Sequence, residues 1–178
     1  MKIMAEIYSH RELLFNLVSR NLTSRYKNSM LGFLWSILTP LFMALIYVVF
    51  LRILARAVRL EEVLIGVFAW QFTAQCVGNG LTCITDNANL VKKVYFPRLI
   101  LPLSMTLSNL VNFLLSLAVL FVLVAILLAQ AGRFMEVTAL AVPLLVVYHS
   151  VFCFAIALFL SCVNVYFRDL QHLVNVLL

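Results

Sequence analysis

Long apolar segments alternate with short polar ones along the chain, and this pattern predicts its secondary structure. The segments made mainly of apolar residues lie at about residues 30–51, 63–85, 104–129 and 137–163. Each is longer than the ~20 residues that a helix needs to cross a hydrocarbon core of about 30 Å. The pattern therefore predicts an all-α membrane protein with a single transmembrane domain over residues 1–178.

A further stretch, residues 9–29, repeats apolar and charged positions with the period of a helix. Its apolar sector contains Leu14, Phe15, Val18, Leu22 and Tyr26. An apolar stripe opposite a charged side is typical of a helix that lies in the headgroup region of a membrane. Arg11 and Arg25 fall in the apolar sector, so their side chains either snorkel to the surface or pair with a protein partner. The basic residues expected at the membrane surface are Arg11, Arg20, Arg25 and Lys27.

The second apolar segment carries a polar stripe along one side of its predicted helix. Its members are Gln71, Gln75, Asn79, Thr82 and Thr85. Because lipid offers no hydrogen bonds, this side should face protein or water. The stripe can serve either as hydrogen bonds between helices or as the lining of a pore. Trp35 and Phe42 share one face of the first segment, and they either line the same pore or face lipid.

Other side chains in the apolar segments suit contacts between helices. Small polar residues recur at four-residue spacing in the third segment, where they let helices approach and hydrogen-bond. They are Ser104, Ser108, Asn112 and Ser116. His149 is expected to hydrogen-bond to a neighbouring helix. The four cysteines form no C-x-x-C pair, and we expect them to be small buried side chains.

A short basic insert, residues 86–98, separates the second and third apolar segments. Asp86 or Asn87 can cap a short helix, which should end near Tyr95 because Pro97 disfavours helix at the residue before it. So short a helix is not stable alone in water and needs something to dock against. The insert is either a knob presented to a cytoplasmic partner or an ordinary loop whose lysines only set the topology.

Composition and charge narrow the class of protein. The chain is 65% hydrophobic and only 11% charged, whereas a soluble domain is nearer half apolar and a quarter charged. Its net charge is +6. In a membrane protein an excess of basic residues sets the orientation of the chain and contacts anionic headgroups, so we do not interpret it as binding of nucleic acid. With a cytoplasmic N-terminus, nine basic residues lie inside and four outside, three of them in the first outer loop. The insert at residues 86–98 is then cytoplasmic.

The sequence contains none of the catalytic or nucleotide-binding motifs that we considered. It has no phosphate-binding G-x-x-x-x-G-K-[ST], no dinucleotide fingerprint, and neither H-E-x-x-H nor G-x-S-x-G. No Asp or Glu lies within a predicted span to relay protons. We therefore expect a chain that is not an enzyme, binds no metal, and depends on another subunit for any energy that it uses.

Three stretches of sequence together resemble the membrane subunit of bacterial ABC exporters for O-antigen, capsular polysaccharide and teichoic-acid polymers. They are "SRYKNSMLGFLWSILTPLFMALIYVVF", "NLVKKVYFPRLILPLS" and "NVYFRDLQHLVNVLL". The resemblance implies a homodimeric permease in the bacterial inner membrane that moves lipid-linked polysaccharide. It also implies that ATP and Mg²⁺ bind to a separate ABC ATPase, so that this chain needs no cofactor.

By the same resemblance, residues 86–98 form a cytoplasmic coupling segment that contacts the ATPase. Its contact residues would be Asn89, Leu90, Lys92, Lys93, Tyr95, Phe96, Pro97 and Arg98. The family has six spans, whereas only four are predicted before Leu178, so we expect an incomplete six-span permease. Alternative functions are a permease subunit of an ABC exporter for a drug or lipid, and a membrane anchor that transports nothing.

Overall fold

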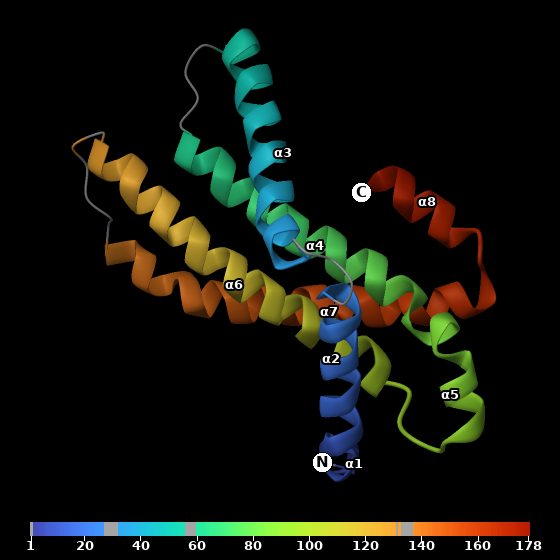
Figure 1. Cartoon of the computed structure of the whole chain (residues 1–178). Helices are drawn as coiled ribbons and strands as arrows, with labels where there is room; N and C mark the ends of the chain where they lie inside the picture. The colour runs from blue at the N-terminus through green and yellow to red at the C-terminus, as the bar shows by residue number, and fades with distance from the viewer. Residues whose placement is uncertain (1, 27–31, 56–59, 131, 133–136) are drawn as a thin grey trace.

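The chain folds into helices that follow one another with short connections (Figure 1). The residues that the computed structural model describes are 2–26, 32–55, 60–130, 132 and 137–178. Lys27, one of the basic residues predicted at the membrane surface, lies outside them. The elements are α1 (Lys2–Ser9), α2 (Arg11–Tyr26), α3 (Gly32–Ala55), α4 (Leu60–Asp86), α5 (Ala88–Lys93), α6 (Ile100–Gln130), the 3₁₀ helix η1 (Val137–Ala141), α7 (Val142–Tyr166) and α8 (Leu170–Leu177). The predicted all-α class is confirmed.

Three long helices, α4, α6 and α7, lie side by side, and α3 crosses α4 and α6 (Figure 1). α4 is the central member, because it contacts α7, α6 and α3. Ile100–Gln130 and Ala139–Tyr166 are both long and apolar enough to cross a membrane. α3 and α4 contain 24 and 27 residues, which at 1.5 Å per residue makes them about 36 and 40 Å long. The four predicted spans thus correspond to four long helices.

Small residues bring α4 and α7 into close contact. A Cβ atom added to Gly80 would lie 2.5 Å from the Cβ atom of Ala157, and real Cβ atoms do not come that close. Ala157 is fully buried, and its methyl group cannot rotate away from the contact. The backbones of the two helices can therefore approach at this point only because residue 80 has no side chain.

The cysteines divide into a buried group and an exposed one. Cys76, Cys83 and Cys153 are buried, as predicted, and Cys76 and Cys153 belong to one cluster between α4 and α7. Cys162 is exposed, so the prediction is wrong for this residue. It follows the buried Ser161 in α7, and one residue further along a helix turns the side chain by about 100°. That rotation carries Cys162 out of the bundle.

The small polar residues of the third predicted span lie in the interior of the bundle. All four members of the stripe are buried: Ser104, Ser108, Asn112 and Ser116. The hydroxyls of Ser104 and Ser108 donate to backbone carbonyl oxygens of their own helix, at 2.8 and 2.7 Å. α6 contacts both α2 and α4. Their burial agrees with the prediction that these residues let helices approach, but the hydroxyls of Ser104 and Ser108 bond within α6 rather than to a neighbouring helix.

The helix α2 docks onto protein along one side. Leu17 is only 4% exposed and packs with Cys83, Ile100 and Leu101, which belong to the ends of α4 and α6. Leu14, Val18 and Leu22, from the predicted apolar sector, are half-buried, and Leu14 packs against the same cluster. Phe15, from the same sector, is 72% exposed within the chain, as a side chain that faces lipid would be. α2 therefore buries part of the predicted apolar sector against the ends of α4 and α6 and leaves Phe15 on the surface.

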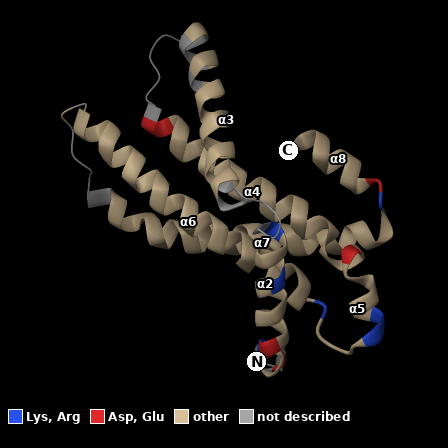
Figure 2. Ribbon diagram, viewed as in Figure 1, with Lys and Arg blue, Asp and Glu red and all other residues tan. Residues whose placement is uncertain are grey.

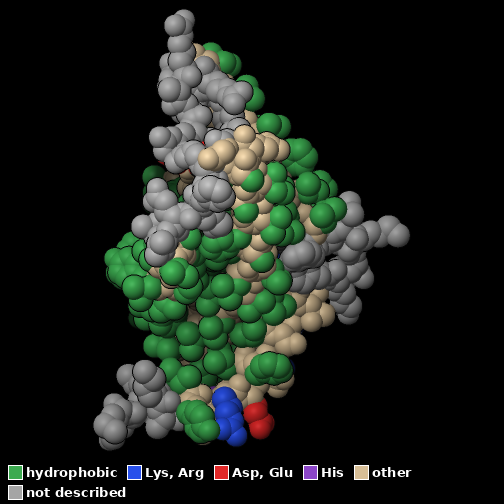
Figure 3. All heavy atoms as spheres, turned by 90° about the vertical axis from the view of Figure 1, so that its left-hand side faces the viewer, with side chains coloured by type: hydrophobic (Ala, Val, Ile, Leu, Met, Phe, Trp, Pro, Cys, Tyr) green, Lys and Arg blue, Asp and Glu red, His purple; other side chains and the backbone are tan. Residues whose placement is uncertain are grey.

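Charged side chains are concentrated away from the middle of the long helices (Figure 2). Lys and Arg lie on α2, on α5 and in the segments that follow α5 and α7. In the view of Figure 3 hydrophobic side chains cover much of the surface that is not drawn in grey, and the plainly visible charged side chains lie at its lower end. An apolar belt with charged ends fits a chain whose long helices are surrounded by lipid.

Candidate functional site

The short helix α5 is held at the junction of α4 and α6 by Asn87. Asn87 stands at the N-cap position of α5, but its side chain makes no capping hydrogen bond. Its Nδ2 donates instead to the backbone oxygen of Cys83 at 2.8 Å, and its Oδ1 accepts from Arg20 Nη2 at 2.6 Å. Asn87 thereby connects the end of α4, the start of α5 and the helix α2. The prediction of a short helix after Asp86 or Asn87 matches α5, which ends at Lys93.

The two aromatic residues after α5 have opposite environments. Phe96 is 7% exposed and packs against Leu17, Ile100 and Leu101, so it fixes the segment to its own chain. Tyr95 is 100% exposed. Of the two predicted aromatic contacts with the ATPase, only Tyr95 presents its ring on the surface. Phe96 is buried because the chain turns back towards α6 at this residue.

The other residues predicted to contact an ATPase lie on the surface or close to it. Exposed are Asn89, Lys92, Lys93 and Arg98, and half-buried are Leu90 and Pro97. A cavity of about 330 Å³ lies beside α5, and its lining includes Arg20, Asp86 and Lys93. Both signs of charge line this cavity, so a partner's polar side chain could enter it and find a hydrogen-bond partner.

Arg25 reaches from α2 into the space between α4 and α6. Its Nη1 donates to Gln75 Oε1 at 3.1 Å and its Nη2 to Asn109 Oδ1 at 3.0 Å. Asn109 Oδ1 also accepts from Asn79 Nδ2 at 3.1 Å, and Asn109 Nδ2 donates to the backbone oxygen of Gln75 at 3.2 Å. Gln75 and Asn79 therefore make hydrogen bonds between helices, one of the two roles that the sequence left open. Arg25 pairs within its own chain in this structure.

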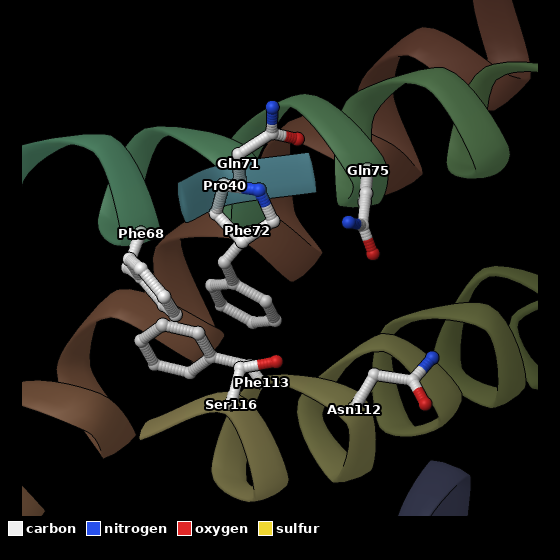
Figure 4. A pocket seen from close by; sticks show the side chains of 8 residues that line it. All are labelled: Pro40, Phe68, Gln71, Phe72, Gln75, Asn112, Phe113 and Ser116. Carbon is white, nitrogen blue, oxygen red and sulfur yellow. The ribbon is translucent and has the colours of Figure 1, made fainter. Parts of the chain in front are cut away.

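Gln71 and Gln75 line a small cavity between α3, α4 and α6 (Figure 4). Its volume is about 20 Å³, which is room for about one water molecule. The rings of Phe72 and Phe113 stack at one side of it, with 4.6 Å between centroids, and the amides of Gln75 and Asn112 lie towards the other. Amides and aromatic rings are thus brought together, but one copy of the chain leaves no room there for a sugar.

The remaining residues predicted to line a channel lie elsewhere. Trp35 and Phe42 on α3 are each about half exposed, at 52% and 53%. Thr82 and Thr85 are half-buried, and the hydroxyl of Thr85 donates to the backbone oxygen of Thr82 at 2.9 Å. None of the four lines the cavity of Figure 4.

Two further polar residues have partners within the chain. Arg11 is exposed, with its guanidinium carbon 4.8 Å from the centre of the Tyr8 ring, a distance typical of a cation–π contact. His149 Nε2 lies 2.8 Å from the hydroxyl oxygen of Thr73, across the contact between α7 and α4. The prediction that His149 hydrogen-bonds to a neighbouring helix is confirmed.

The sequence alone did not point to Asn109 or to Gly80. Asn109 is 1% exposed and holds together the polar cluster that contains Arg25. It stands one position past the regular stripe that includes Ser108, so the four-residue spacing missed it. The position of Arg25 in an apolar sector was the signal that it needed a polar partner. Gly80 gave no signal, because its role depends on the facing Ala157.

The bundle, its apolar belt and the basic helix at one end define an α-helical integral membrane protein. Residues 12–178 match the ABC-2 type transporter family, and the chain belongs to this family of membrane permeases. It is 35% identical over 182 residues to the O-antigen export system permease protein RfbA of Myxococcus xanthus, across 100% of this chain and 68% of that protein. Two proteins of the same name from Klebsiella pneumoniae are 31% and 32% identical to it, across 92% of this chain and 63% of each.

The chain thus spans about two thirds of the length of these relatives, or slightly less. Their names confirm the resemblance to permeases of O-antigen export that the three sequence stretches indicated. They also describe transport subunits, in keeping with the expectation of a chain that is not an enzyme.

Proposed function

We propose that this chain is the transmembrane subunit of an ATP-driven exporter that moves lipid-linked polysaccharide across the bacterial inner membrane. It works as a homodimer with a separate ABC ATPase, which binds ATP and Mg²⁺, and its N-terminus is cytoplasmic. Membership of the ABC-2 type transporter family and the O-antigen export names of its relatives support the proposal. A drug or lipid exporter of the same architecture would have the same coupling and a different cargo.

The observation that carries the proposal is the contrast between the two sides of the α5 segment. On its inner side, Asn87 and Phe96 attach it to α2, α4 and α6. On its outer side, Lys92, Lys93 and Tyr95 are exposed. A segment attached in this way transmits a push from a bound partner to the long helices as a rigid-body movement. An ordinary connecting loop would need no such attachment.

The path of the polymer is proposed to run beside the polar face of α4. Sugars present hydroxyl groups and flat C–H faces, so a conduit for them should combine amides with aromatic rings. Gln71, Gln75, Phe72 and Phe113 provide both kinds of group next to one another (Figure 4). Because the cavity there is about 20 Å³, passage requires the helices to separate or a second copy to complete the channel. Under this proposal the lining also includes Asn79, Thr82, Thr85, Trp35 and Phe42.

The test uses the full permease purified together with its ATPase and returned to lipid vesicles. Alanine at both Lys92 and Lys93 is expected to lower ATP hydrolysis and the transport of lipid-linked polysaccharide across the vesicle membrane about tenfold, equivalent to ~1.4 kcal/mol of coupling. The matched control replaces Arg56 and Arg59, between α3 and α4, and also removes two positive charges. Unchanged hydrolysis and export in the Lys92/Lys93 variant, or equal losses in both variants, would show that α5 does not couple the two subunits.

A further inference from the structure

We propose that Arg25, together with Asn79 and Asn109, forms a binding site for the phosphate group of a membrane lipid. The proposal goes beyond the exporter function, because it assigns a ligand, the phosphate of a lipid, to a place near the membrane surface. It relies on that function only for the possibility that the lipid carries a polymer. Nothing in the family match or in the names of the relatives assigns a ligand to these residues.

The site is a cavity of about 260 Å³ between α2, α4 and α6, more than ten times the volume of the cavity in Figure 4. Seven of its eight lining residues are polar, among them Ser24, Arg25, Asn79, Ser108 and Asn109. A water-sized void needs only about 10–15 Å³, so this space holds a group much larger than one water molecule. Its size and polarity suit a phosphate with its first substituents.

The charge of Arg25 is the feature that selects an anion. Among the described residues, Arg25 donates side-chain hydrogen bonds to two acceptors, Gln75 Oε1 and Asn109 Oδ1, and both are neutral amide oxygens. These two bonds orient the guanidinium, but they supply no negative charge to balance it. A guanidinium has five N–H donors, and its planar fork matches phosphate oxygens. The second N–H of the Asn79 amide adds a neutral donor beside it, since its first is given to Asn109.

The position of the cavity along the helices indicates a lipid as the source of that anion. Asn79 precedes the end of α4 by seven residues and Asn109 follows the start of α6 by nine, about 10 and 14 Å at 1.5 Å per residue. α4 is about 40 Å long and the hydrocarbon core about 30 Å thick, so about 10 Å of the helix extends beyond the core. The basic residues of α2 and α5 lie at the end of α4 that leads into α5, and with the excess length at that end the cavity lies at the boundary with the headgroups. Lipid phosphates occupy that boundary. The phosphate could belong to a bilayer phospholipid or to the diphosphate of an isoprenoid carrier, and both offer the same oxygens.

The experiment measures binding to the purified full-length permease in maltoside detergent, which contains no phosphate, by native mass spectrometry. The probes are dioleoyl phosphatidylglycerol and farnesyl diphosphate, with dioleoylglycerol as the probe without phosphate. Arg25→Gln removes the charge, and its fold is checked by thermal unfolding. Ser24→Asp places a carboxylate at the cavity from an exposed position of α2, so it tests the site without disturbing the bonds of Arg25. Ser19→Asp makes the same change on exposed α2 outside the cavity lining.

Both Arg25→Gln and Ser24→Asp should weaken binding of a phosphate probe about tenfold, while Ser19→Asp and Arg11→Gln should stay within about twofold. A loss restricted to phosphatidylglycerol assigns the site to bilayer lipid, and a loss that includes farnesyl diphosphate assigns it to a diphosphate carrier. The proposal is overturned if neither phosphate probe binds better than dioleoylglycerol, or if Ser24→Asp and Ser19→Asp weaken binding equally. This experiment contains no ATPase, so its result does not depend on the coupling proposal. A failure to bind lipid phosphate would likewise leave the coupling proposal untouched.

Discussion

The contact between Gly80 and Ala157 is where a single atom should matter most. A Cβ added at residue 80 lies 2.5 Å from the Cβ of Ala157, so Gly80→Ala forces α4 and α7 apart. Overpacking of this kind typically costs about 1–3 kcal/mol. We expect Gly80→Ala to lower the midpoint of thermal unfolding of the permease in detergent.

The matched rescue is Ala157→Gly, which removes the methyl group that the new Cβ would meet. The double variant Gly80→Ala/Ala157→Gly should regain most of the lost stability, less about 1 kcal/mol for glycine within a helix. If the double variant is less stable than Gly80→Ala alone, the close approach is not the reason that residue 80 is glycine.

A second prediction at the residue scale concerns the hydrogen bond between Arg20 and Asn87. It is 2.6 Å long, its donor is charged, and it is partly buried. Hydrogen bonds to charged groups contribute about 1.5–3 kcal/mol. Arg20→Ala should therefore loosen α5 and raise the hydrogen-exchange rates of the Leu90 and Val91 amides about tenfold or more.

Arg11→Ala is the control, since Arg11 is exposed on the same helix and contacts only Tyr8 among the contacts that the structure describes for it. It should leave exchange in α5 unchanged. A double-mutant cycle with Asn87→Ala separates the bond from unrelated effects: Arg20→Ala should add little in a background that already carries Asn87→Ala. Fully additive effects would mean that the two residues act independently.

At the scale of elements, periodicity and length located most of the helices, and packing decided how they lie. The four long apolar segments became α3, α4, α6 and α7, because length and hydropathy are strong local signals. The sequence did not show which apolar residues of α2 would be buried most deeply, because that depends on the apolar surface that Ile100 and Leu101 offer. The same dependence on distant contacts explains why Phe96 is buried while its neighbour Tyr95 is exposed. Sequence identified the α5 segment, but not how it is attached.

For the candidate channel, the sequence identified polar and aromatic side chains that could line it. The structure shows which of them bond to other helices and which lie on the surface. Gln75 and Asn79 lie on the predicted stripe, yet they bond to Arg25 and Asn109. Side-chain partners thirty or more positions apart leave no trace in a local pattern. We propose that these residues also line a path for sugars. That path requires the helices to separate or a second copy of the chain to complete the channel.

At the scale of the whole molecule, the orientation in the membrane can be tested at the two ends of the bundle. Lys93, at the end of α5, and Gln130, at the end of α6, are both exposed. α6 begins seven residues after Lys93, and its 31 residues separate this end of the bundle from Gln130. In a background with Cys162→Ala, Lys93→Cys should react with a membrane-impermeant maleimide only in inside-out vesicles. Gln130→Cys should react in intact spheroplasts. Labelling in the reverse sense would place α5 outside, contrary to the distribution of basic residues.

The central claim, that the α5 segment is where this permease meets its ATPase, is tested most directly by a photo-crosslinking residue at position 95 in the full complex in membranes. Tyr95 is fully exposed, so a benzophenone side chain can replace it without disturbing the core. The matched control has the same group at Phe152, which is exposed on α7 within a predicted span. The account predicts a covalent product with the ATPase from position 95 and none from position 152. Irradiation that yields no such product from position 95, while the complex remains assembled, would contradict it.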